Sequence, residues 1–359
     1  MKISALYTYP IKSLRATALD SAVVTKHGFE YDRRFMILEV QKDDNGKTTY
    51  MNMHVAHYPE MVLFLTSLRQ PTKEDGSDGN ITVTYQPPRG SGKDEKTLSV
   101  PLVPATGQLQ VIDVEMHKSP TKAYKMPAEY NDWLSSCFGF DVILAYLGEH
   151  LRPVLMSTSA NRQKSASSNN AGGWLSSITS TASSFIGGQE NQAPEEERVT
   201  FADCAPYLVV SEKSMEGVFN RLPAEDKAEF DLIKFRPNIV VSGASEVWEE
   251  DYWGEVTIGG KTKIDTAQNC GRCKSINIDY ATGQPGTGEA GNMLKKMMSD
   301  RRVDKGTKWN PIFGRYSFLA PGSDGNMISV GDEVVVSKKN AEHTDFGKCS
   351  IQWCSLRRC

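Results

Sequence analysis

Two cysteines separated by two residues form the strongest chemical signal in the chain. They stand in the segment Asn269-Cys270-Gly271-Arg272-Cys273. On spacing alone, three interpretations stay open: a thiol–disulfide centre, half of a zinc site completed by cysteines of the tail, or one thiolate that binds a cofactor metal. Arg272 next to Cys273 favours a thiolate and offers paired donors to a phosphate. Buried structural cysteines are the remaining alternative.

Five further short segments combine cations or polar residues with aromatic residues. They are Tyr9-Pro10-Ile11-Lys12-Ser13, Tyr31-Asp32-Arg33-Arg34-Phe35, Phe201-Ala202-Asp203-Cys204-Ala205-Pro206-Tyr207-Leu208, Phe235-Arg236-Pro237-Asn238-Ile239 and Phe313-Gly314-Arg315-Tyr316. Arg236 is the most informative, because an arginine inside the apolar run Phe235–Ser242, which predicts a strand, needs a partner.

The six segments, in this order and with these gaps, resemble the MOSC family, in which an N-terminal β-barrel domain precedes the MOSC domain. The resemblance is strongest to the amidoxime-reducing component branch. It covers nearly all of residues 1–150 and 199–338.

The resemblance implies a molybdenum cofactor whose metal takes one protein thiolate, from Cys273, which makes Cys273 both the metal ligand and the catalytic residue. The positions that match the family's grip on the cofactor's phosphate and pterin are Lys12, Ser13, Arg33 and Arg236. Positions that match the lining more loosely are Asp203, Cys204, Asn238, Gly271, Arg272 and Tyr316. Position 204 is often a small hydroxyl residue in relatives, so the cysteine here departs from the pattern.

The resemblance further implies a molybdenum oxidoreductase that reduces small N-hydroxylated substrates, of amidoxime or hydroxylamine type, by oxo transfer. Its electrons would come from an external donor, either a b-type cytochrome with its NADH-dependent reductase or a ferredoxin-like protein. The alternative is a molybdenum-cofactor carrier or sulfur-transfer module without turnover, because MOSC domains also occur in cofactor sulfurases.

Composition sets the limits within which these residues must be positioned. The chain has 359 residues with 41 basic and 44 acidic side chains, a net charge of −3 that argues against nucleic acid as a partner. Seven cysteines in so long a chain argue against a disulfide scaffold.

Short alternating segments bounded by Gly, Pro, Asn and Asp predict a mainly β fold with short helices, in which an N-terminal barrel-like domain packs against a MOSC barrel. A helix is expected over Pro127–Phe138, and strands over Ser275–Tyr280 and in a final hairpin over Met327–Ser337. The expected organisation is a first domain over 1–150, a Ser/Thr/Asn-rich linker over 151–198, the MOSC domain over 199–340 and a flexible tail over 341–359.

One stretch of the linker, Trp174–Ile186, places its bulky apolar residues on one side of a helical wheel with Ser and Thr elsewhere and no charge. Two interpretations stay open: a peripheral contact with a lipid surface, and a disordered linker that docks on the protein. The N-terminus has no signal-peptide core, and no apolar run reaches the length of a membrane span. The expected location is cytoplasmic, including the surface of an organelle membrane.

Overall fold

The computed structural model describes residues 1–71, 78–88, 90–154, 197–227, 230 and 232–346. The linker stretch Trp174–Ile186 and most of the tail over 341–359 lie outside these residues. Within the described ranges, no helix combines the length and the apolar character that crossing a membrane requires.

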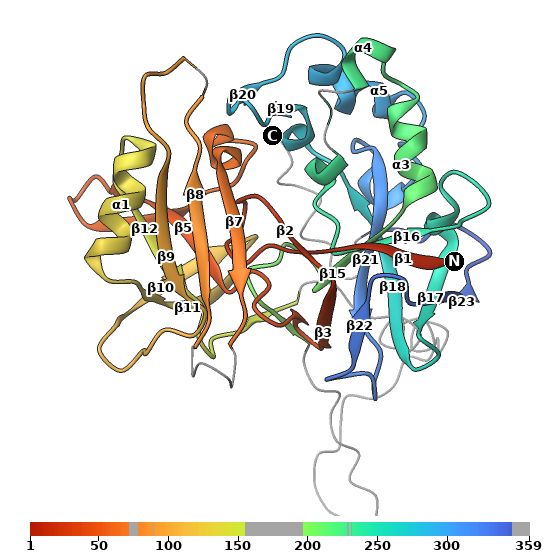
Figure 1. The fold of residues 1–359 in the computed structure, drawn as a ribbon, viewed down its shortest axis with the longest axis horizontal. Coiled ribbons are helices and arrows are strands. Elements are labelled where there is room, and N and C mark those ends of the chain that lie inside the picture. Colours follow the sequence, from red (N-terminus) through yellow and green to blue (C-terminus); the bar gives the residue numbers. More distant parts are fainter. Residues whose placement is uncertain (72–77, 89, 155–196, 228–229, 231, 347–359) are drawn as a thin grey trace, which may run out of the picture.

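The largest sheet has eight strands in the order β2-β1-β16-β15-β21-β18-β17-β23 (Figure 1). Its strands are β1 (Lys2–Thr8), β2 (Thr17–Leu19), β15 (Tyr207–Ser211), β16 (Ile239–Ser242), β17 (Trp253–Ile258), β18 (Thr262–Gly271), β21 (Ile312–Leu319) and β23 (Val334–Lys339). β15 and β16 are parallel, and such a pair needs a crossover connection, which helix α3 (Glu212–Phe219) begins.

The other half of the molecule is a second group of antiparallel strands. One sheet has the order β10-β11-β12-β5-β6, with β5 (Phe35–Lys42), β6 (Thr48–Asn52), β10 (Gln110–Met116), β11 (Ser119–Lys125) and β12 (Val142–Tyr146). A three-stranded sheet holds β7 (Phe64–Arg69), β8 (Asn80–Tyr85) and β9 (Lys96–Pro101). Together they form a nearly closed barrel, so the predicted mainly β fold with short helices and a barrel-like N-terminal region is confirmed.

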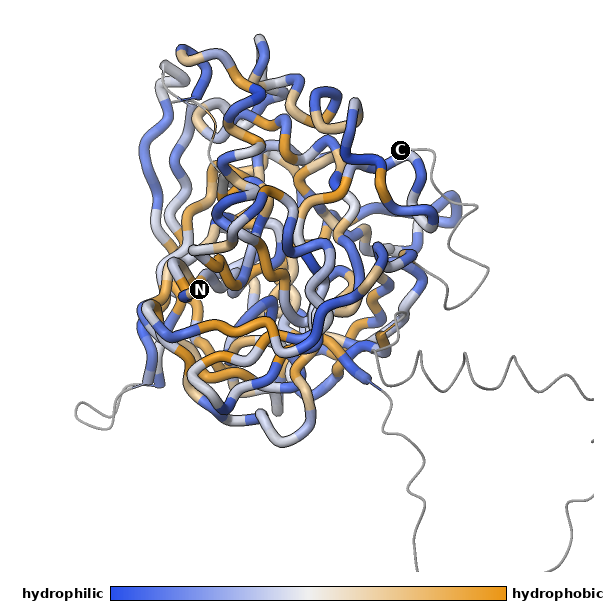
Figure 2. Tube along the Cα trace, turned by 90° about the vertical axis from the view of Figure 1, so that its right-hand side faces the viewer, coloured by the Kyte–Doolittle hydropathy of each residue, from blue (hydrophilic) through white to orange (hydrophobic). Residues whose placement is uncertain are grey.

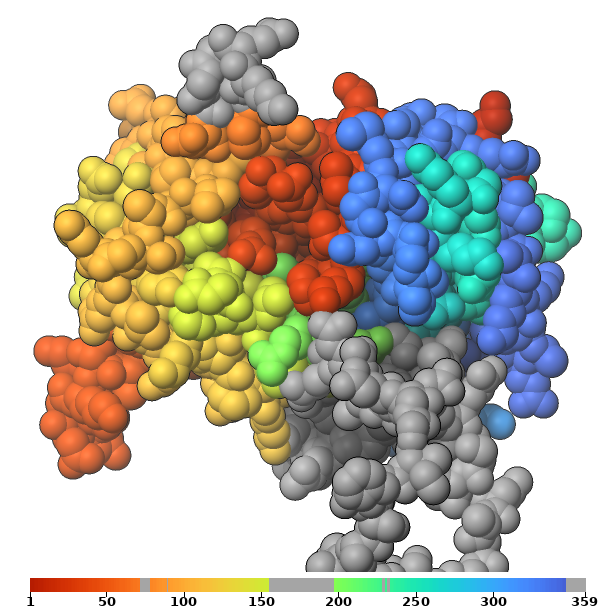
Figure 3. Space-filling view, turned by 90° about the horizontal axis from the view of Figure 1, so that it is seen from below, coloured from red at the N-terminus to blue at the C-terminus, as the bar shows by residue number. Residues whose placement is uncertain are grey.

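The first 25 residues join the two halves. β1 pairs with β16, and β3 (Ser21–Thr25) pairs with β22 (Met327–Ser329), so N-terminal strands complete sheets of the second half. In Figure 3 these N-terminal residues, in red, lie between the orange and yellow half and the blue half. The remaining short strands are β4 (Gly28–Phe29), β13 (Arg152–Pro153), β14 (Arg198–Val199), β19 (Ile278–Asp279) and β20 (Gln284–Pro285).

Each half has its own apolar interior, as the orange segments inside the trace in Figure 2 indicate. Phe35, Phe64 and Ile81 are among the fully buried residues of the barrel, and Trp253 and Ile264 among those beside the large sheet. Burial of one face explains why the strands alternate, whereas β12 and β15, buried along their whole length, are apolar runs.

Helices are few and short. α1 (Ala128–Phe138) confirms the expected helix: Pro127 precedes it and Gly139, with φ 86°, ends it in the left-handed conformation that glycine adopts most readily. The others are α4 (Ala224–Lys227), α5 (Met293–Met298) and the 3₁₀ turns η1 (Pro59–Leu63), η2 (Leu232–Phe235), η3 (Glu249–Tyr252), η4 (Lys274–Asn277), η5 (Ala290–Asn292) and η6 (Lys305–Thr307).

Three local predictions were wrong. Ser275–Tyr280 is mostly the turn η4, followed by the two-residue strand β19. β22 and β23 do not pair as a hairpin, because β22 pairs with β3 and β23 with β17. The strand expected from Phe235 starts only at Ile239, and Arg236 precedes it with φ 57°.

Candidate functional site

The loop that follows β1 brings Tyr9 into the interior between the two halves. Tyr9 is fully buried, and its hydroxyl donates to the carbonyl of Pro237 at 3.0 Å. Its backbone N–H donates to the buried carboxylate of Asp32 at 2.8 Å, and Asp32 also accepts from the Thr8 hydroxyl. Burial raises the pKa of the Tyr9 hydroxyl well above its usual range, so it stays a proton donor.

Two guanidinium groups lie over the ring of Tyr9. The Cζ of Arg236 is 4.3 Å from the ring centroid and that of Arg33 is 4.7 Å away, distances typical of cation–π contact. Arg33 is ion-paired with Asp32 and donates to the Asn238 side chain at 3.3 Å. Three predicted site residues, Arg33, Arg236 and Asn238, are therefore brought together from both halves of the chain.

Lys12 lies beside them in a buried ion pair. Its side chain is only 7% exposed and contacts the carboxylate of Asp203, which is 53% exposed and lies 3.2 Å from Nε2 of His117. Burial lowers the pKa of Lys12, and Asp203 opposes this effect. Partial removal from water would raise the pKa of Asp203, but Lys12 and His117 hold it well below its usual range.

Three of the seven described non-glycine residues with positive φ are predicted site residues. Ser13, Arg33 and Arg236 have φ values of 70°, 50° and 57°, in the left-handed region that residues with a side chain rarely adopt. The Ser13 hydroxyl is at the limit of hydrogen-bond distance, 3.5 Å from the carbonyl of Met53. Such strain persists only where surrounding contacts fix it, and it often marks ligand-binding loops.

The two cysteines of the central motif have different environments. Cys270, at the end of β18, is 2% exposed and accepts from Nη1 of Arg272 at 2.9 Å. Nη2 of the buried Arg272 donates to the carbonyl of Phe235, the residue before Arg236, at 2.7 Å. Cys273 is an exposed free thiol with Sγ 3.2 Å from Oγ of Ser275.

These contacts bear on the three interpretations of the motif that contains Cys270 and Cys273. Neither cysteine is in a disulfide, and the described part of the chain contains no group of three or more Cys, His, Asp or Glu that could hold a metal ion by itself. The described residues show a single exposed thiol, Cys273, directly after the buried Arg272, and the tail cysteines that a zinc site would need lie outside them. We call Lys12, Arg33, Arg236 and Arg272 the cation cluster.

Cys204 and Tyr316 lie next to each other, close to Cys270 and Asp203. Burial raises the pKa of Cys204 to about 12, while a hydrogen bond from Tyr316 acts in the opposite direction. Tyr316 also hydrogen-bonds with Cys270, and burial raises the pKa of its hydroxyl well above its usual range. Both shifts favour the protonated side chains, and a place for Cys204 in the cofactor lining stays a prediction.

Several residues that line the site were missed from sequence. Tyr9 and Asp32 stand inside the quoted motifs, but only their contacts in three dimensions reveal a role. Tyr280 was missed entirely: its ring lies 4.5 Å from Cζ of Arg15 and 5.4 Å from Nζ of the buried Lys234. Lys234 was detectable only as a second cation two residues before Arg236.

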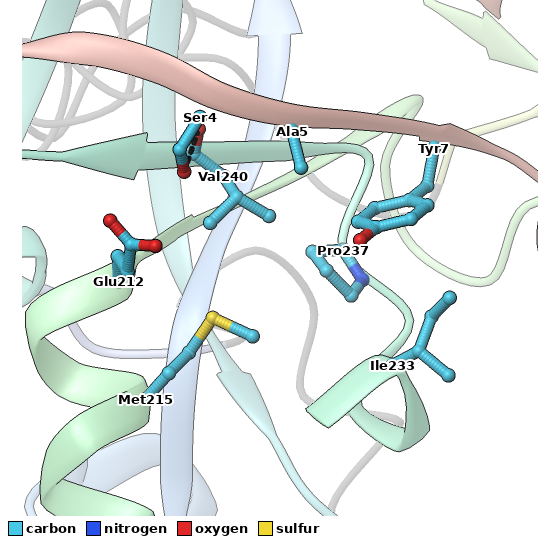
Figure 4. Close-up of a pocket in the computed structure, with 8 residues that line it drawn as sticks. All are labelled: Ser4, Ala5, Tyr7, Glu212, Met215, Ile233, Pro237 and Val240. Carbon is cyan, nitrogen blue, oxygen red and sulfur yellow. Dashed lines mark hydrogen bonds between the residues drawn. The ribbon is translucent and has the colours of Figure 1, made fainter. Parts of the chain in front are cut away.

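A separate cavity of about 250 Å³ lies on the other side of Pro237 (Figure 4). Its walls come from β1, β16, η2 and α3, through Ser4, Ala5, Tyr7, Glu212, Met215, Ile233, Pro237 and Val240. None of the cation cluster lines it, and most of its lining is apolar. The cation cluster is therefore the better candidate for the functional site.

Taken together, the fold and the cation cluster define a mainly β protein in which side chains of both halves gather into a group of cations next to a cysteine motif. Two family models match the chain: "MOSC N-terminal beta barrel domain" over residues 1–141 and "MOSC domain" over residues 196–335. The chain therefore belongs to the MOSC-domain family, as its motifs predicted.

Curated relatives share this two-domain span. The chain is 29% identical to "Mitochondrial amidoxime-reducing component 1" of Mus musculus over 92% of this chain and 81% of that protein. It is 24% identical to the protein of the same name from Xenopus laevis, over the same shares of both chains. It is also 26% identical to "Molybdenum cofactor sulfurase" of Homo sapiens over 96% of this chain, but spans only 33% of that protein.

Proposed function

We propose that this chain binds a molybdenum cofactor at the cation cluster, with Cys273 as the protein ligand of the metal, and reduces small N-hydroxylated compounds. The observation that carries the proposal is Nη2 of Arg236, a buried donor without a hydrogen-bond partner in the structure. A buried charged donor left unpaired is costly, so its presence favours an anionic ligand that accepts from it.

The charge balance of the site supports the same conclusion. Arg33 is paired with Asp32 and Lys12 with Asp203, but Arg236 and Arg272 form no ion pair with any described residue. Their hydrogen bonds go to the carbonyls of Leu14 and Phe235 and to the sulfur of Cys270. Nη2 of Arg236 and Nε of Arg272 have no partner among the described residues, so both guanidinium groups keep a donor for the phosphate of a pterin cofactor.

The remaining residues would bind and orient. Lys12 and Ser13, on the strained loop after β1, would hold the phosphate end, and Asn238 and Asp203 would offer polar contacts to the pterin. The exposed thiol of Cys273 is free to become a thiolate ligand, and soft sulfur suits a redox metal. When bound, the cofactor supplies the two-electron removal of oxygen from the N–O bond, with two protons leaving in the water formed.

The similarity to a molybdenum cofactor sulfurase favours a second candidate, a cofactor carrier or sulfur-transfer module that does not turn over. Both candidates need the same anion site. Their difference lies in whether a substrate is reduced.

The test uses the purified full-length chain. Molybdenum and pterin analysis measures cofactor binding, and reduction of benzamidoxime with dithionite-reduced methyl viologen measures turnover. We expect near-stoichiometric molybdenum and steady reduction. Cofactor without reduction would support the carrier, and a chain that takes up neither molybdenum nor pterin would refute both.

A further inference from the structure

A cationic surface with an exposed tryptophan lies next to the cysteine of the candidate site. The loop that contains η6 packs on the central motif: the Asn310 side chain donates to the carbonyl of Arg272 at 3.0 Å, and the Arg272 N–H donates to the carbonyl of Pro311 at 2.8 Å. The residue before Asn310 is Trp309, and the residue after Arg272 is Cys273. The two exposed side chains therefore lie on adjoining segments.

Trp309 has no counterpart elsewhere on the described surface. Its side chain is 73% exposed, more than any other large hydrophobic residue in the described ranges. Tryptophan is enriched among the residues that dominate protein interfaces.

Exposed lysines lie on the same loop as Trp309 and on the adjoining segment. Lys305 and Lys308 precede Trp309 on the η6 loop, and Lys274 follows Cys273 directly. None of the three is ion-paired with another described residue. We call Lys274, Lys305, Lys308 and Trp309 the lysine–tryptophan surface.

The acid within the same loop does not neutralise this surface. Asp304 is 1% exposed, and its carboxylate accepts from the side-chain amide of Asn269 and from the backbone N–H groups of Gly306 and Phe346. It therefore fixes the shape of the loop. The positive charges of the lysines face solvent, and an acidic partner would complement them.

We propose that the lysine–tryptophan surface is the docking site of an acidic, one-electron carrier protein that delivers electrons to the site at Cys273. This inference rests on the proposed reductase function. Reduction of an N–OH group to N–H with release of water consumes two electrons and two protons, so the carrier must dock twice for each substrate molecule. Lysines accelerate encounter with an acidic surface, and a central aromatic residue anchors the complex.

The position of the surface favours a redox partner over other occupants. It adjoins the segment that carries the proposed metal ligand, so a carrier bound there would have a short path for its electrons. An anionic lipid surface could also attract lysines and a tryptophan, but lipid binding would give no reason for the surface to adjoin Cys273.

The experiment compares two electron sources on the cofactor-loaded full-length chain. One source is the soluble haem domain of an acidic b-type cytochrome with its NADH-dependent reductase, and the other is dithionite-reduced methyl viologen, which needs no docking. The variants are K305E/K308E and Trp309→Ala. The matched controls are Lys261→Glu, an exposed lysine in the β17–β18 turn, and Val103→Ala, an apolar residue that is 61% exposed.

With the cytochrome, K305E/K308E should lower kcat/KM for the carrier at least about tenfold at low salt and flatten its salt dependence, and Trp309→Ala should lower it by a similar factor. The rates of both variants with viologen should stay within about twofold of wild type, because viologen needs no docking. The rates of both control variants should stay within the same range with either electron source, because their substitutions leave the docking contacts intact.

Three results would overturn the docking site. One is unchanged cytochrome-driven activity in both variants. Another is an equal loss with both electron sources, which would indicate damage to the site itself. The third is unchanged reduction together with lost flotation on phosphatidylserine vesicles, which would make the surface a lipid contact. Absence of viologen-driven reduction in the wild type would instead refute the proposed function.

Discussion

Arg236 is a half-buried cation, and its guanidinium is hydrogen-bonded to the protein at one end only. Nη1 donates to the carbonyl of Leu14 at 2.8 Å, while Nη2 has no partner and the backbone is in the left-handed region. Burial lowers the pKa of its guanidinium, an effect that the neighbouring Tyr9 and Tyr280 oppose. A strained residue that keeps a buried donor unpaired is better explained by a ligand than by stability.

Replacement of Arg236 by Met separates these two roles. Loss of one charge-assisted contact, roughly 1.5–3 kcal/mol, should weaken cofactor binding about 10- to 100-fold. The cofactor-free variant should unfold at a temperature no more than about 2 °C below that of the cofactor-free wild type, because an unpaired buried charge has been removed. The measurements are molybdenum content and thermal unfolding. A large loss of stability with unchanged molybdenum content would make Arg236 a structural residue.

The replacements Cys273→Ser and Cys270→Ser should have very different effects on benzamidoxime reduction. Cys273 is exposed, so Cys273→Ser should leave the unfolding temperature unchanged but reduce benzamidoxime reduction to background, because a hydroxyl is a poor substitute for a thiolate ligand. Cys270→Ser should retain much of the activity, because a serine oxygen can still accept from Arg272, at a stability cost of about 1 kcal/mol. Full activity in Cys273→Ser would contradict the ligand assignment.

At the scale of elements, the contact between η3, α3 and α5 holds two acidic residues of different character. Asp251 is paired with Arg301 at 2.7 and 3.0 Å, and the guanidinium lies 4.0 Å from the Trp248 ring centroid. Glu250 is equally buried, but among the described residues only the Ser214 hydroxyl donates to its carboxylate, and Oε1 has no partner. Burial and the charge of Asp251 raise the pKa of Glu250 to about 7, against the hydrogen bond from Ser214.

This pKa predicts how stability depends on pH. An acid whose pKa is higher in the folded state gives stability at low pH that is lost as pH rises from its ordinary value toward its folded value. The free energy of unfolding should therefore fall between about pH 4.5 and 7, by roughly 3 kcal/mol at most, at about 1.4 kcal/mol per pKa unit.

Glu250→Gln should remove most of this fall, because an amide does not ionise. Urea unfolding at pH 5, 6, 7 and 8 measures it, with the exposed Glu333→Gln as the matched control. Identical pH profiles for wild type and Glu250→Gln would show that Glu250 does not titrate in this range.

Local sequence patterns predicted where strands and helices lie better than they predicted which strands pair. Alternation of apolar residues and the Pro127–Gly139 punctuation identify many strands and α1, because both depend on near neighbours. The alternation of Ile276 and Ile278 also imitates a strand, although η4 occupies most of that segment. Strand pairing is set by contacts distant in sequence, so the pairing of β22 with β3 was not predictable from the turn at Gly331-Asp332.

The candidate site also has residues that the sequence predicted and residues whose roles only the three-dimensional contacts reveal. The resemblance of the short motifs to the MOSC family pointed to the residues of the cation cluster, and the sequence by itself singled out Arg236, because an arginine in an apolar context needs a partner. The roles of Tyr9, Asp32 and Tyr280 depend on which loops meet between the two halves, and no spacing within one loop encodes that meeting. The exposure of Trp309 was likewise visible only once the η6 loop was placed on the central motif.

At the scale of the whole molecule, the N-terminal segment determines how the two halves are joined. Leu6 pairs with Ile239, and Ala22 pairs with Ile328, and these side chains belong to the apolar core beside the large sheet. β13 and β14 add a further pairing across the halves, between Arg152 and Val199. The site loops follow these strands directly, so the same pairings that join the halves also bring Lys12 to Asp203 and Tyr9 to Arg236.

This arrangement predicts that the two halves associate without a covalent link. Residues 1–154 and 197–359, co-expressed as separate chains, should copurify and elute together in gel filtration, because β1 and β3 bury apolar side chains in the core of the second chain. The matched control is residues 26–154 with 197–359, which lacks β1 to β3 and should not copurify. Since Lys12 and Tyr9 are also absent from that control, it should bind no molybdenum, whereas the first pair should bind it. Stable association of the shortened pair would mean that the remaining contacts between the halves suffice, and that the N-terminal strands complete the sheet without holding the site together.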